Sequence, residues 1–142
     1  MLLAWAVSCD SYELHDDGTA DIFAAGFDTF RVDALPAELD LAVLLRSCCS
    51  RTKKANWRST VLGPDTTPLG NLAFTITADP GPDHRPGYTV SQIEALKLVF
   101  LAETEGIYSV ELYVGHSAGN ATSEERRRSI FFNVREGLPE RD

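Results

Sequence analysis

"EGIYSVELYVGH", residues 105–116, is the stretch that decides the fold of this chain. Its apolar bulk comes from four side chains: Ile107, Val110, Leu112 and Val114. Glycines stand near both of its ends, and the residues between them are mostly β-branched, aromatic or aliphatic. Such a run predicts a β-strand, because these side chains pack well on a pleated surface.

Similar apolar runs recur on both sides of this stretch, and residues that favour turns separate them. Asp17-Gly18 is a pair typical of two-residue hairpins, and Gly63-Pro64-Asp65 favours another turn. We therefore expect about eight strands, over residues 2–9, 19–32, 39–49, 57–62, 71–77, 95–102, 105–116 and 127–134.

Eight short strands without alternating helices predict an all-β fold, either an antiparallel β-sandwich or a barrel, and we favour the sandwich. The residues that open the deciding strand, "ETEGIY" at 103–108, resemble the tyrosine corner of immunoglobulin-like sandwiches, in which the phenol bonds the upstream backbone. The disulfide of those domains is not expected, since no cysteine follows Tyr108.

Two further expectations concern local structure and domain limits. Ser91 and Glu94 have the spacing of a helix capping box, so a short helical turn before the strand at 95–102 is an alternative to a longer strand. A chain of 142 residues is long enough to bury a sizeable core in one domain. We predict a single domain over residues 1–137 and a disordered tail at 138–142.

The net charge of −8 is concentrated near the N-terminus. Residues 1–40 hold nine acidic residues and one arginine, whereas the rest of the chain is neutral. Because an acidic surface repels phosphate groups, we expect no binding to nucleic acid or to an anionic membrane. No run of about twenty apolar residues is present, which predicts no spanning helix.

The cysteine content indicates a reducing compartment. Three cysteines at irregular spacing do not form a disulfide framework, so a cytoplasmic location is expected. "AVSC" at residues 6–9 loosely resembles a lipoprotein cleavage box, but the preceding residues lack a positively charged start.

The stretch "LLRSCCSRTKKANW", residues 44–57, is interpreted as strand, polar turn and strand. Successive side chains of a strand point to opposite faces, so Cys48 and Cys49 are poorly placed to share a metal ion. The cations of the turn form a candidate basic patch: Arg51, Lys53 and Lys54. These cations solvate a hairpin end in one interpretation and bind a phosphate-bearing partner in another.

A long loop rich in proline and glycine at residues 79–87 is a second candidate site, because long ordered loops are often functional. Its candidate interaction residues are Asp83, His84, Arg85 and, directly after it, Tyr88. No nucleophile elbow, phosphate-binding glycine loop or zinc motif occurs in the chain. We therefore expect no catalytic residue, no metal and no cofactor.

"AVSCDSYELHDDGTADIFAAGFDTF", residues 6–30, resembles the opening of a family of small bacterial β-sandwich proteins of unknown function that is common in actinobacteria. "EGIYSVELYVG" is similar to a strand near the end of those proteins. The resemblance covers about a third of the chain. It implies a β-sandwich and transfers no catalytic residue.

These observations favour a non-catalytic interaction module that binds a protein partner, or a second copy of itself as a homodimer, through sheet edges and loops. The alternative is a sandwich that binds a small molecule or carbohydrate, for which Trp5, Trp57 or Tyr88 would need to be exposed. A cysteine- or metal-dependent enzyme is the third hypothesis.

Overall fold

The computed structural model describes residues 2–26, 28–49, 53–78, 90–118 and 121–137. Within them lie ten strands and no helix. The strands are β1 (Leu2–Cys9), β2 (Ser11–Leu14), β3 (Ala20–Phe23), β4 (Thr29–Val32), β5 (Ala37–Cys49), β6 (Lys53–Leu62), β7 (Pro68–Ala78), β8 (Val90–Ala102), β9 (Gly106–Ala118) and β10 (Ala121–Glu136). The expectation of an all-β fold is confirmed.

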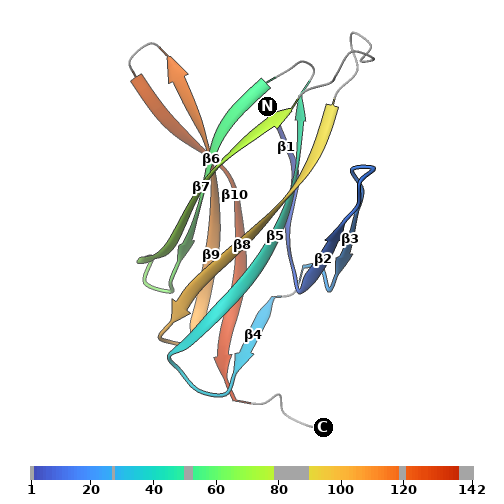
Figure 1. Ribbon diagram of the computed structural model, residues 1–142. Helices are drawn as coiled ribbons and strands as arrows, with labels where there is room; N and C mark the ends of the chain where they lie inside the picture. The colour runs from blue at the N-terminus through green and yellow to red at the C-terminus, as the bar shows by residue number, and fades with distance from the viewer. Residues whose placement is uncertain (1, 27, 50–52, 79–89, 119–120, 138–142) are drawn as a thin grey trace.

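The strands form two large sheets and one hairpin (Figure 1). One sheet has the order β1-β5-β8 and the other the order β4-β10-β9-β6-β7. All neighbours are antiparallel except β4 and β10, which run parallel. That pair departs from the purely antiparallel sandwich that the sequence predicted. A parallel neighbour requires a long connection, and here residues 33–120 lie between β4 and β10.

The core lies between the two sheets, and alternation within each strand builds it. On β5 the buried inner side chains are Leu39, Leu41, Val43 and Leu45, as the period-two pattern predicted. On β9 they are Tyr108, Val110, Leu112 and Val114. Trp57 of β6 is 2% exposed and stacks on Phe74 of the neighbouring β7. The two sheets also approach at one edge, where the backbone of β7 at Gly70 lies against the Val99 carbonyl of β8.

Tyr108 forms the backbone contact that the sequence predicted for it. Its hydroxyl donates a hydrogen bond of 2.6 Å to the Thr104 carbonyl, four residues upstream. Gly106 allows the backbone to take the conformation that this contact needs. Its φ is +144°, and a Cβ at this position would lie 2.7 Å from Pro64. Only glycine tolerates both conditions.

The hairpin of β2 and β3 lies outside the three-stranded sheet. Tyr12 shares a hollow with Ala42 and Lys97, which point outward from that sheet. Leu44 also points outward from β5, yet it is fully buried. The base of the hairpin is tied down by hydrogen bonds from the Asp10 amide to the Phe23 carbonyl and from the Gly26 amide to the Ser8 carbonyl.

Several sequence predictions of the N-terminal part need correction. The predicted strand at 19–32 is broken into β3 and β4, because Ala24 and Gly26 adopt positive φ and turn the chain from the hairpin to the five-stranded sheet. A β-bulge between Leu3 and Trp5 places Leu3 on the inner face, whereas Trp5 points outward. The predicted hairpin turn at Asp17-Gly18 is confirmed, with the His15 amide bonded to the Thr19 carbonyl.

Corrections in the remaining chain all lengthen strands. The helical turn at 91–94 is wrong, since Ser91 and Ile93 continue the ladder between β8 and β5. β6 begins at Lys53, so most of the predicted polar connection is strand. β10 begins at Ala121, six residues before the predicted start at 127. The predicted tail at 138–142 lies outside the described residues.

We predict that Tyr108→Phe lowers the free energy of unfolding by about 1 kcal/mol, the typical net contribution of one hydrogen bond. Urea denaturation measures this loss. Tyr113→Phe is the matched control, because the Tyr113 hydroxyl has no hydrogen-bond partner among the described residues. An equal loss in both variants would contradict a special role of the Tyr108 contact.

Candidate interaction surface

The outer face of the five-stranded sheet carries an ordered polar network. We call this surface, formed by the outward side chains of β4, β10, β9, β6 and β7, the five-strand face. At one end of it the Arg58 guanidinium binds the Glu124 carboxylate at 2.8 Å and stacks on the Tyr113 ring at 4.4 Å from the ring centre. Arg58 also donates to Thr60 and Asn71, which are bonded to each other. These contacts hold a long cationic side chain in one place.

Glu111 lies at the centre of the same face. Its side chain is only 6% exposed, although it points away from the core between Thr60 and Ser129. The hydroxyls of Ser109 and Ser129 donate hydrogen bonds to its carboxylate, and an Arg126 nitrogen lies 4.0 Å away. A buried carboxylate requires such donors, because desolvation without them is costly.

Apolar side chains occupy the other end of the five-strand face. Phe131 is 64% exposed and Ile107 is 58% exposed, the highest values for large hydrophobic residues in the described part of the chain. The register places both on the outer side of adjacent strands, since Phe131 opposes Ser109 and Ile107 opposes Asn133. An exposed apolar group beside organised polar contacts is typical of a protein interface.

The face is cationic on an acidic molecule. Its outward positions include Arg31 and Arg135, which are register partners on β4 and β10. The other cations of the face are Lys54, Arg58 and Arg126, against which stand two carboxylates, Glu111 and Glu124. The chain as a whole has a net charge of −8, so the remaining surface is strongly acidic.

The β2–β3 hairpin is the acidic counterpart of this surface. Between Ser11 and Phe23 it holds four carboxylates and no lysine or arginine. Glu13 and Asp21 are direct register partners, and both are exposed. Asp21 binds the His15 ring at 3.0 Å, and this hydrogen bond, aided by nearby carboxylates, raises the pKa of His15. Exposed apolar side chains accompany the charges: Tyr12, Leu14 and Phe23.

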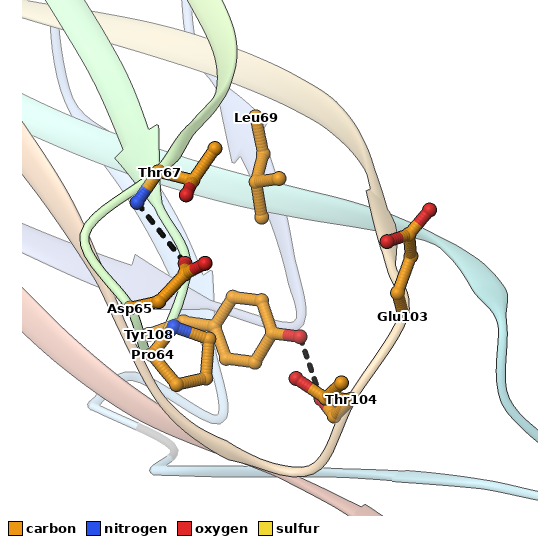
Figure 2. A pocket seen from close by; sticks show the side chains of 8 residues that line it. Pro64, Asp65, Thr67, Leu69, Glu103, Thr104 and Tyr108 are labelled. Carbon is orange, nitrogen blue, oxygen red and sulfur yellow. Dashed lines mark hydrogen bonds between the residues drawn. The ribbon is translucent and has the colours of Figure 1, made fainter.

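Figure 2 shows a hollow at the end of the sandwich near Tyr108, lined also by Pro64, Asp65, Leu69 and Glu103. Its volume is about 270 Å³, slightly below the range usual for small-molecule sites. Hydrogen bonds from Thr67 hold the pKa of the Asp65 carboxyl below its usual value. These bonds stabilise the turn between β6 and β7, so Asp65, like the Tyr108 hydroxyl, already has a structural partner.

The structure brings few of the sequence-predicted site residues together. The candidate loop residues Asp83, His84, Arg85 and Tyr88 lie outside the described residues, as does Arg51 of the candidate basic patch. Lys53 begins β6, and Lys54 is exposed on that strand. Trp57, a candidate for carbohydrate stacking, is buried in the core, which contradicts that use of its ring.

The cysteines follow the structural interpretation as far as they are described. Cys9 is a buried free thiol, whose pKa is raised by burial, and Cys48 is a half-buried free thiol. Cys49 ends β5 beside it. Within the described ranges, no group of three or more His, Cys, Asp or Glu side chains is arranged to hold a metal ion. The same ranges contain no helix long and apolar enough to cross a membrane.

Sequence reasoning missed the five-strand face. The signal was present in the alternation of the deciding strand, where Ser109, Glu111 and Tyr113 occupy the positions between buried ones. Their arrangement with Arg58 and Ser129 depends on strand order, which that alternation alone does not fix. Comparison of the chain with models of known protein families and with curated proteins finds no match.

We predict that Glu111→Ala lowers the free energy of unfolding by about 1–3 kcal/mol, because it leaves two sheltered hydroxyls without their acceptor. The matched control is Glu124→Ala, which removes an exposed ion pair and should cost about 0–1 kcal/mol. Denaturant unfolding at neutral pH compares the two. If Glu111→Ala proved as mild as the control, the central carboxylate would have no structural role.

The hairpin generates a pH prediction. Because the folded pKa of His15 is raised, its ion pair stabilises the hairpin at pH values below the unfolded pKa, and this contribution disappears as pH rises through the folded pKa. An NMR titration of the ring should show Asp21→Asn lowering the His15 pKa, whereas Asp16→Asn leaves it nearly unchanged. Equal effects of the two variants would exclude a specific His15–Asp21 contact.

Proposed function

We propose that this chain is a non-catalytic, immunoglobulin-like interaction module that binds protein through the five-strand face. The observation that carries the proposal is the pairing, on one exposed sheet surface, of the two most exposed large hydrophobic side chains with immobilised polar and cationic groups. Interfaces are enriched in aromatic residues and arginine, and ordered side chains lose little entropy on binding.

The arrangement of the core supports the immunoglobulin-like part of the proposal. In such domains a buried tryptophan and a tyrosine corner lie on neighbouring strands of one sheet, and the tyrosine precedes a cysteine by two residues. Here Trp57 and Tyr108 lie on adjacent strands β6 and β9, and Val110 stands at the position of that cysteine. Val110 is fully buried, so apolar packing occupies the place that the disulfide has in those domains.

Three features favour binding over catalysis in this proposal. The chain contains no recognised catalytic motif. In the hollow near Tyr108, the Asp65 carboxylate and the Tyr108 hydroxyl already bond the local turn and backbone. Glu111, the buried carboxylate of the face, has its hydrogen-bonding capacity directed to serine hydroxyls.

Free thiols at Cys9 and Cys48 favour a reducing, cytoplasmic location.

The proposal predicts that the double variant Phe131→Ser, Ile107→Ser loses a bound protein that the wild-type chain retains. Both side chains are largely exposed, so the substitutions should change stability by no more than about 0.5 kcal/mol each. Native mass spectrometry of the full chain, purified gently from cells of its source with reductant present, measures the bound mass.

The matched control is Val99→Ser, Leu101→Ser, which removes two exposed apolar side chains from the outer face of the other sheet. This control should keep the bound protein. A wild-type chain that carries neither a second copy nor another protein would contradict the proposal. So would equal retention by the five-strand variant and the wild type.

A further inference from the structure

We propose that the five-strand face binds a second copy of this chain. The acidic β2–β3 hairpin of one copy docks on the five-strand face of the next. This inference rests on the proposed function and adds the identity of the partner. It concerns a head-to-tail contact between two different surfaces, rather than a symmetric dimer.

The first support is the distribution of exposed apolar groups. Seven large hydrophobic side chains are exposed in the described part of the chain. Three belong to the hairpin and two to the five-strand face, and of the hairpin's three only Phe23 lies on the same side as Glu13 and Asp21. Phe23, Ile107 and Phe131 are therefore the exposed apolar groups on the two surfaces that the proposal joins. The remaining two, Val99 and Leu101, lie on β8 and serve above as the control.

The second support is charge complementarity. The outward side of the hairpin places Glu13 beside Asp21 as direct cross-strand partners, with Phe23 two residues further along β3. The five-strand face places Arg31 beside Arg135. Ile107 lies opposite Asn133, which is two positions before Arg135. Like charges directly opposite each other on a sheet are unfavourable in an isolated copy. Contact between the two surfaces would place each pair against opposite charge.

The spacing of the two surfaces agrees with such a contact. A strand rises about 3.3 Å per residue, so Phe23 lies roughly 7 Å along the hairpin from Asp21. Ile107 lies a similar distance along the sheet from Arg135, on the next strand. On the same strand as Arg135, Phe131 lies between Arg135 and Arg126, so apolar groups lie beside cationic ones on the face, as Phe23 lies beside the acidic pair Glu13 and Asp21 on the hairpin.

A single copy cannot make this contact with itself. The hairpin lies outside the three-stranded sheet, where Tyr12 faces Ala42 and Lys97 across a hollow. The five-strand face is the outer surface of the opposite sheet. Since the outer faces of two packed sheets point away from each other, the contact joins separate copies. Two different surfaces in contact produce a ring or an open chain of copies, depending on the rotation between neighbours.

The decisive experiment is a charge swap on the purified full chain, followed by sedimentation velocity over a range of protein concentration at low salt. Wild-type chain should form concentration-dependent oligomers that added salt dissociates. Glu13→Lys with Asp21→Lys, and separately Arg126→Glu with Arg135→Glu, should each weaken association by roughly tenfold or more. The quadruple variant, which carries all four substitutions, should associate again because the Glu13–Asp21 and Arg126–Arg135 positions have exchanged sign.

The control is Arg46→Glu with Arg128→Glu, which makes the same change of net charge at exposed arginines away from the five-strand face. This variant should associate like the wild type, and circular dichroism should show that every variant folds. The inference is overturned if the purified wild-type chain is monomeric throughout, or if the quadruple variant stays dissociated. A monomeric wild type that still captures a different protein through Phe131 and Ile107 would leave the proposed function standing and remove only this inference.

Discussion

The aromatic cluster of Phe100, Tyr108 and Phe132 is the contact on which the rest of the structure depends. Phe100 comes from the three-stranded sheet and the other two rings from the five-stranded sheet, and all three ring centres lie 5.7–6.0 Å apart. Phe30 of β4 packs edge-on against Phe132 at 5.5 Å. These rings join both layers, and they hold β4 beside β10 as well. Aromatic pairs of this geometry add stability beyond the area that they bury.

The position of this cluster determines what faces outward. Because β9 directs Tyr108 and Val110 into the core, it must direct Ser109 and Glu111 to the other side. The polar network around Glu111 is therefore a consequence of the same alternation that builds the core. A slip of one residue would exchange the two sets and place a carboxylate among the aromatic rings.

Local patterns in the sequence predicted the strands well where alternation was strong. The stretches at 39–49 and 105–116 became long strands, and the phenol of Tyr108 made its expected contact, whereas Ile107 of the expected apolar bulk points outward. The break at Ala24 was missed because alanine carries no local signal for positive φ. The start of the last strand was placed too late, at 127, since the charges of residues 124–126 are typical of a solvated turn, yet pairing with β9 holds them in a strand.

The candidate surface was less predictable than the fold for a physical reason. Its members come from five strands, and only the order β4-β10-β9-β6-β7 brings them to one face. Charge counting along the chain found the acidic N-terminal part but not its cationic opposite, because those arginines and lysine come from separate parts of the sequence. Sheet pairing gathers them after folding. The immunoglobulin-like proposal, in contrast, started from a local feature of the sequence, the residues at 103–108 that precede and open β9.

The close approach of β7 to β8 at Gly70 also bears on aggregation. The free edge of a sheet offers unpaired amide and carbonyl groups to any passing strand, and long apolar edges such as β8 are the usual sites of uncontrolled assembly. At Gly70 a Cβ would already lie 3.4 Å from the Val99 carbonyl, so at this point the two edges shield each other. Growth of the sheets by edge pairing is thereby obstructed at this point, which would leave the outer faces as the route for the reversible association proposed above.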